Sequence, residues 1–312
     1  MNNGKLTRVT GLAVWITAAW LTAPVFAQAD LEGGWIAKLH QDWQDRNPGP
    51  DLADYSGLPI NAEARAKALA YSASILSQPQ RQCLYYTEVY LATGGGGMKM
   101  WSESDSVTGK VVAWKVSAAL DRAFLTVWMD GRPHPPKYAP HPLGGFTTGV
   151  WEGRVLTTYT SHMKAGYLRR NGVPTSDQAI LIMHFIQHGD LLTIHSHIED
   201  PLYLTEPDVD TTIYQRDPAG RQRRTPNPCT PAVEVAAEGI EGAVPHYLPG
   251  KNPFVDEDPS KRHIPPDALM GGAETTYPEY RKKLKDIYVV PEKCIRYCCG
   301  GGNIEGLGCP AR

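Results

Sequence analysis

The sequence predicts a mainly β protein, folded as an antiparallel barrel or strongly curved sheet. Short segments rich in Val, Ile, Trp, Tyr and Thr recur about every 8 to 12 residues, which is typical of sandwiches and barrels. Turn signals such as Asp130-Gly131 and Glu152-Gly153 separate them. No helical crossover segments lie between these strands, so a parallel sheet is not expected.

The expected strands lie between residues 98 and 214. They cover residues 98–101, 111–116, 123–129, 149–151, 155–160, a hairpin across residues 180–198, and 204–214. The Pro-rich residues 132–136 and 139–142 are expected to form an ordered surface loop. Gly33-Gly-Trp35 near the start is a weak indication of a lipocalin-like barrel.

The hairpin carries four of the ten histidines. Gly189-Asp190 separates two runs rich in Ile, Leu and Thr, as a hairpin turn would. Because side chains alternate between the faces of a strand, His184 and His188 share one face, and His195 and His197 point together on the next strand. The pattern predicts a histidine-bearing face, which we expect to line a pocket.

One helix is expected before the sheet. Asn61 is a suitable N-cap, and residues 62–74 are rich in Ala, Glu, Lys and Arg. The expected apolar stripe of this short amphipathic helix consists of Ala66, Leu69, Ala70 and Ala73.

Residues 1–27 have the pattern of a secretory signal peptide. Lys5 and Arg8 precede an apolar run, and the small residues Ala27 and Ala29 offer a cleavage site. An uncleaved membrane anchor is the weaker alternative, because Pro24 and two threonines interrupt the run. We therefore expect a periplasmic or secreted protein without a membrane span after cleavage.

The net charge of −2 and the pI near 6.6 predict no nucleic-acid partner. The six cysteines favour disulfides in an oxidising compartment, and they are Cys83, Cys229, Cys294, Cys298, Cys299 and Cys309. Cys83 and Cys229 are natural partners, whereas the pairing of the four tail cysteines stays open. A zinc knuckle in the tail is the alternative.

Composition divides the mature chain in two. Residues 28–231 form the expected β domain with its helix. Residues 232–312 have few apolar residues and form an irregular C-terminal extension, with a short helix at residues 280–287 and a Cys-rich tail. We expect the extension to wrap over the sheet and to be pinned by disulfides.

Several segments carry a resemblance to a family of uncharacterised exported bacterial proteins. They are residues 49–59, 128–136, 166–177, 199–207, 244–250 and 272–280. The resemblance implies export and brings no established activity. This chain departs from the family at Met183, where an acidic residue is common, at Arg154, where Asp is common, and at His195 and His197, where aliphatic residues stand. The tail from Cys294 to Cys309 looks like an addition.

Three histidines are candidate metal ligands. His162, His184 and His246 would supply the three imidazoles of a catalytic zinc site with an open fourth position. The alternative is that each is an ordinary surface or core histidine. His195 and His197 form a second, more local candidate chelate.

Charged residues nearby are candidate substrate contacts. Arg169 and Arg170 beside Asp177 could hold a carboxylate or phosphate group, although surface pairing across a turn is the commoner explanation. His246 and Tyr247 are further candidates for ligand contact. Glu206 would act as a general base if it faced the same cavity as His184 and His162.

The leading hypothesis is an exported small-molecule-binding protein. Eight tryptophans and 15 tyrosines suit a cavity for an apolar or aromatic ligand. The first alternative is a metal- or histidine-dependent enzyme of hydrolase or lyase type in the same cavity, with a divalent metal such as zinc as cofactor. The second is a structural envelope protein that docks a partner.

Overall fold

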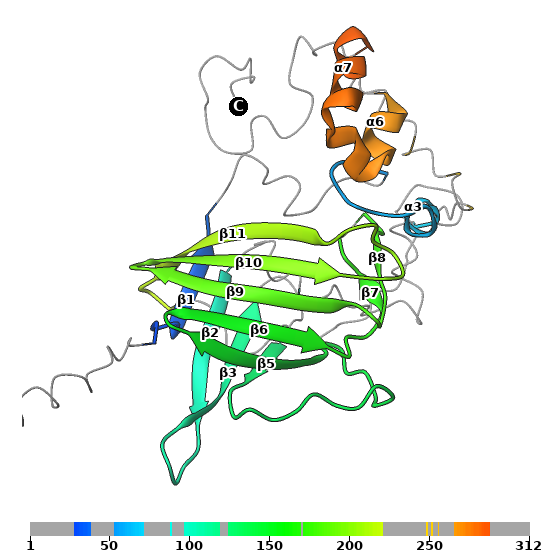
Figure 1. Cartoon of the computed structure of the whole chain (residues 1–312). Coiled ribbons are helices and arrows are strands. Elements are labelled where there is room, and N and C mark those ends of the chain that lie inside the picture. Colours follow the sequence, from blue (N-terminus) through cyan, green and yellow to red (C-terminus); the bar gives the residue numbers. More distant parts are fainter. Residues whose placement is uncertain are drawn as a thin grey trace, which may run out of the picture.

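The computed structural model shows a closed barrel of nine strands (Figure 1). It describes residues 28–38, 53–71, 88, 97–118, 124–169, 171–220, 248, 251, 255 and 265–287. Around the barrel the order is β1 (Gly33–Ala37), β11 (Asp208–Asp217), β10 (Leu191–Glu199), β9 (Ile180–His188), β6 (Val155–Ser161), β5 (Phe146–Glu152), β4 (Phe124–Trp128), β3 (Val111–Ala118) and β2 (Gly97–Ser104). The prediction of a mainly β barrel is confirmed.

The barrel is mixed, which corrects the expectation that it is antiparallel throughout. A closed ring with an odd number of strands must contain a parallel pair, and here β4 and β5 are parallel, with Val127 opposite Thr147. Residues 129–145 form no strand. They lead the chain back to the end of the barrel where β4 begins, so that β5 runs in the same direction as β4. His134 fastens this segment to β5 and β6, because its ring nitrogens lie 2.9 Å from the Thr148 hydroxyl and 2.7 Å from the Ser161 hydroxyl.

The predicted alternation in β9 and β10 is present, but the histidine face is the outer one. Met183 and Phe185 are fully buried inside the barrel, and so is Ile194. His184 and His195 lie opposite each other on the outside. The expected histidine-lined interior is therefore wrong, because closing the barrel places the other face of each strand inward.

Apolar side chains fill most of the inward positions. The largest fully buried ones on the barrel strands are Trp35, Phe185, Met98, Met100, Leu125, Leu156 and Leu181. Gly149 is required inside because a Cβ there would come within 2.5 Å of the Val127 side chain. The barrel thus has a packed core of the kind that stabilises small β-barrels.

A short helix, α3 (Ala62–Leu69), covers one end of the barrel. The Asn61 side chain accepts a hydrogen bond from the Ala64 amide at 2.9 Å, so the cap expected from the sequence is present. The buried stripe consists of Ala64 and Ala68, whereas Ala66 is exposed. The predicted stripe is therefore wrong at Ala66, whereas Leu69 packs against the core as expected and Ala73 lies outside the described residues. Helix α3 ends at Leu69 rather than at residue 74.

Part of the C-terminal extension is helical. It contains α6 (Pro266–Met270), η3 (Gly272–Thr276) and α7 (Pro278–Ile287), which lie beside α3 in Figure 1. Backbone hydrogen bonds join η3 and α6 to the segment before α3, from the Tyr55 amide to Leu269 at 2.8 Å and from the Ala273 amide to Leu58 at 2.7 Å. The short helix expected at residues 280–287 is present within α7. The irregular character expected for the residues before it is corrected, since α6 and η3 fold against residues 53–60.

None of the helices that the structure describes is long and apolar enough to cross a membrane. Residues 1–27 and all six cysteines lie outside the described residues. The structure therefore does not test the predicted signal peptide, disulfides and zinc knuckle, which stay predictions.

Candidate functional site

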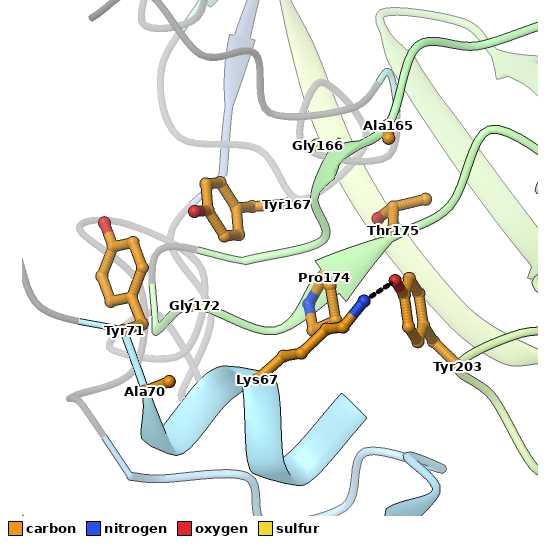
Figure 2. Close-up of a pocket in the computed structure, with 10 residues that line it drawn as sticks. All are labelled: Lys67, Ala70, Tyr71, Ala165, Gly166, Tyr167, Gly172, Pro174, Thr175 and Tyr203. Atoms are coloured by element: carbon orange, nitrogen blue, oxygen red, sulfur yellow. Dashed lines mark hydrogen bonds between the residues drawn. The ribbon is translucent and has the colours of Figure 1, made fainter. Parts of the chain in front are cut away.

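A cavity of about 380 Å³ lies at the end of the barrel where β10 ends and β11 begins (Figure 2). It is bordered by α3, by the small sheet of β7 (Gly166–Tyr167) and β8 (Pro174–Thr175), and by the β10–β11 connection. Its lining residues are Lys67, Ala70, Tyr71, Ala165, Gly166, Tyr167, Gly172, Pro174, Thr175 and Tyr203. This volume falls within the range of small-molecule sites.

The start of α3 is tied directly to the chain segment that carries Tyr203. The Asn61 side chain donates to the Leu202 carbonyl at 2.8 Å, and the Asn61 amide donates to the Tyr203 carbonyl at 2.9 Å. An antiparallel bridge between Ile60 and Leu204 continues the contact. These bonds fix the helix so that Lys67, nearly two turns further on, meets the Tyr203 ring.

Lys67 and Tyr203 form the polar side of the cavity, drawn at the lower right of Figure 2. The Lys67 ammonium donates to the Tyr203 hydroxyl and lies 4.6 Å from the centroid of its ring. This hydrogen bond, together with Glu63 at 3.4 Å, raises the pKa of Lys67 above its ordinary value, so the side chain stays protonated at neutral pH. Because the Tyr203 oxygen accepts this bond, its own O–H remains available to donate.

Two further tyrosines form the aromatic side. Tyr71 follows α3 and Tyr167 lies in β7, with ring centroids 5.2 Å apart in an edge-to-face arrangement. The close approach depends on Gly172, which has φ +88° and where a Cβ would come within 2.3 Å of the Tyr71 side chain. A residue with a side chain at position 172 would push Tyr71 out of place.

Asp200 positions two parts of the cavity wall, β8 and the β10–β11 connection. Its buried carboxylate accepts hydrogen bonds from the Ser176 amide and hydroxyl, each at 2.7 Å, and from the Leu202 amide at 3.0 Å. Ser176 follows Thr175 in the chain, and Leu202 precedes Tyr203. One side chain therefore positions β8 and the β10–β11 connection relative to each other.

The Thr175 hydroxyl is the least satisfied polar group in this wall. Thr175 is only 2% exposed, and its Oγ1 atom has no hydrogen-bond partner among the residues that the structure describes. Leaving a buried hydroxyl without a partner costs about 1–3 kcal/mol. Because Thr175 lines the cavity, its hydroxyl is a candidate partner for a ligand there.

The predicted metal ligands are not brought together. Thr157 lies opposite His184 in the β6–β9 register, and His162 is five residues beyond Thr157, so the two histidines are separated by on the order of 15 Å. Both nitrogens of His162 have partners, the Ser161 hydroxyl at 2.8 Å and the Pro136 carbonyl at 3.1 Å. In the described residues no group of three or more His, Cys, Asp or Glu side chains could hold a metal ion.

The predicted substrate contacts also lie apart from the cavity lining. Arg169 pairs with Asp210 at 3.2 Å instead of with Asp177, which is exposed. Glu206 is exposed in the connection before β11, away from the outer-face position of His184. Arg170, His246 and Tyr247 lie outside the described residues.

A buried carboxylate lies next to the Arg169–Asp210 pair. Burial raises the pKa of Asp208 from its usual value of 3.8 to about 6, against the opposing effect of the Arg169 charge and with a further increase from Asp210. Asp208 is the first residue of β11, at the same end of the barrel as the cavity. The sequence analysis did not identify Asp208 as a candidate site residue.

Fold and cavity together define a closed mixed β-barrel with a tyrosine-lined pocket at one end. Comparisons with protein-family models, curated proteins and solved structures found no match for this chain. The sequence analysis missed Lys67, Tyr71, Tyr167 and Tyr203, which come from three separate segments. The one signal that pointed to them was the abundance of tyrosine, which predicted a cavity for an aromatic ligand without placing it.

Proposed function

We propose that this protein binds a small molecule with an aromatic or apolar ring and an anionic group, in the cavity between α3, β7, β8 and Tyr203. The observation that supports this most directly is the convergence of three tyrosines, a protonated lysine and an unpaired buried hydroxyl on one cavity. Such sites combine an apolar lining with a few polar groups that orient the ligand.

Each wall offers a different interaction. Tyr71 and Tyr167 present ring edges and faces, which favour stacking with another ring. Lys67 supplies the positive charge, and half of its side chain is exposed, so it can turn toward a ligand without breaking into the core. The Thr175 and Tyr203 hydroxyls are suited to the oxygens of a carboxylate.

The proposal includes export. Residues 1–27 support it through the signal-peptide pattern, and the resemblance to exported bacterial proteins agrees with it. The small molecule would then be met outside the cytoplasm.

Isothermal titration calorimetry with paired probes tests the proposal. We expect benzoate, phenylacetate or 4-hydroxybenzoate to bind more tightly than benzyl alcohol, which has a ring but no charge. In Lys67→Met the affinity for the carboxylate should fall by about tenfold, because a hydrogen bond to a charged group contributes about 1.5–3 kcal/mol. Binding of benzyl alcohol should be unchanged.

Lys110→Met is the matched control, because Lys110 is an exposed lysine in the turn between β2 and β3, far from the cavity. It should bind the carboxylates as the wild type does. The proposal fails if none of the three carboxylates binds, or if Lys67→Met and Lys110→Met lose the same affinity.

A further inference from the structure

Four residues form a straight row across the outer face of the barrel. Thr157 in β6 lies opposite His184 in β9, His184 lies opposite His195 in β10, and His195 lies opposite Thr211 in β11. All four side chains point outward, because their neighbours along each strand are buried inside. Two imidazoles thus stand side by side with a threonine hydroxyl at each end.

The hydrogen bonds at one end of the row fix the proton on His184. The Thr157 hydroxyl donates to the Glu152 carboxylate at 2.9 Å. The same oxygen lies 3.0 Å from Nδ1 of His184, and because its proton is already given to Glu152, it accepts from the Nδ1–H of the imidazole. Neutral His184 therefore carries its proton on Nδ1, which leaves the lone pair of Nε2 free to bind a metal ion.

The His195 ring is turned the opposite way from the His184 ring. Nδ1 of His195 lies 2.9 Å from the Thr211 hydroxyl, on the β11 side, while Nδ1 of His184 faces β6. The two Nδ1 atoms face away from each other, so the ring edges that carry Nε2 face each other above β9 and β10. The ring centroids are 6.1 Å apart and the planes are within 25°. A small rotation of the two side chains would let both Nε2 atoms reach one ion at about 2.0–2.1 Å from this spacing.

This arrangement repeats the support that proteins give to metal-binding histidines. Such a histidine almost always donates its other N–H to an oxygen that is itself held in place, which fixes the tautomer and the ring. Here Glu152, Thr157 and His184 form that relay. His197, the next outward residue on β10, lies 3.6 Å from the Glu199 carboxylate, so His184 and His195 are the candidate ligands of this row.

We propose that His184 and His195 bind one divalent transition-metal ion through their Nε2 atoms on the outer face of the barrel. Two neutral imidazoles favour Cu²⁺ over Ni²⁺ and Zn²⁺, and they have little affinity for Mg²⁺, which prefers oxygen ligands. The site is separate from the tyrosine-lined cavity and does not depend on the small-molecule proposal.

Titration of the full-length protein with Cu²⁺ tests this site. His184→Ala and His195→Ala should each weaken the affinity for one Cu²⁺ by at least about tenfold, and the double variant should lose little more, because both ligands serve the same ion. His188→Ala, which removes an outward histidine from the end of the same strand, should bind Cu²⁺ as the wild type does. His197→Ala should also retain the affinity and thereby exclude a chelate of His195 with His197.

One further variant tests the hydrogen-bond relay from Glu152 through Thr157 to His184. Thr157→Val keeps the shape of the side chain and both imidazoles but removes the oxygen that accepts from His184, so the affinity for Cu²⁺ should fall by about tenfold. Equal affinity in His184→Ala and the wild type would overturn the proposal. So would an equal loss in His188→Ala, which would mean adsorption to scattered histidines only.

Discussion

The interior of the barrel and the cavity at its end contain similar side chains but satisfy their polar groups differently. Inside the barrel the buried hydroxyls of Thr147 and Thr160 bond to each other at 2.8 Å, and the hydroxyl of Thr158 donates to the Met183 carbonyl at 3.4 Å. In the cavity the buried Thr175 hydroxyl has no partner among the described residues. These interior threonine hydroxyls are paired without a ligand, whereas the Thr175 hydroxyl in the cavity wall is not paired within the described residues.

The paired groups inside the barrel therefore contribute to stability, whereas the unpaired group in the cavity wall is suited to the proposed ligand binding. A buried polar group that is paired stabilises the fold, whereas one that is left unpaired lowers stability unless a ligand supplies the partner. Asp200 holds β8 and the β10–β11 connection in place through its own hydrogen bonds. The Thr175 hydroxyl is thereby positioned while it stays without a partner among the described residues. We therefore expect substitutions inside the barrel and in the cavity to have effects of opposite kind.

The largest effect should come from the barrel interior. Phe185→Ala removes a fully buried aromatic side chain and should lower the free energy of unfolding by about 3–5 kcal/mol. Val150→Ala is the control on the outer face, where the side chain is 55% exposed, and it should cost less than about 0.5 kcal/mol. Urea unfolding followed by tryptophan fluorescence measures both. Equal costs would mean that the inner and outer faces are assigned wrongly.

The sequence predicts the parts of this fold that depend on short-range patterns. The alternation around His184 and Phe185 identifies the strands, and Gly189 takes the left-handed backbone, at φ 59°, that the hairpin turn needs. The Asn61 cap is equally local. Which face turns inward is not local, because both faces of β9 carry isoleucine, leucine, methionine or phenylalanine and closure of the barrel decides between them.

The cavity is harder to predict for the same reason. Lys67, Tyr167 and Tyr203 are far apart in the chain, and they meet because Asn61 bonds to the β10–β11 connection and Asp200 bonds to β8. No spacing rule links such residues. The parallel pairing of β4 with β5 likewise depends on the long return segment that His134 fastens to the sheet.

The next effect should come from the buried carboxylate between the two regions. Since the pKa of Asp208 is raised from 3.8 to about 6, its ionisation costs stability, and the cost appears as the pH rises from about 4 to 6. Asp208→Asn should match the wild type near pH 4 and be more stable by as much as about 3 kcal/mol above pH 6, because each pKa unit corresponds to about 1.4 kcal/mol. Urea unfolding at pH 4 and pH 8 measures this.

The control for this pH dependence is Asp177→Asn, which changes an exposed carboxylate near the same end of the barrel. It should leave the difference in stability between pH 4 and pH 8 as in the wild type. A smaller gain in Asp208→Asn at pH 8 than at pH 4 would contradict the assigned direction, because it would mean that the ionised carboxylate stabilises the fold.

The smallest effects should differ in sign between the two regions. Thr160→Val breaks the hydroxyl pair inside the barrel and leaves Thr147 without that partner, so it should lower stability by about 1–3 kcal/mol. Thr175→Val has the same shape change but removes a hydroxyl that is already unpaired, so it should raise the stability of the ligand-free protein by up to about 1 kcal/mol. Benzoate binding should weaken in Thr175→Val and stay unchanged in Thr160→Val. A loss of stability in both variants would show that the Thr175 hydroxyl is satisfied within the protein, and it would then contribute nothing to holding a ligand.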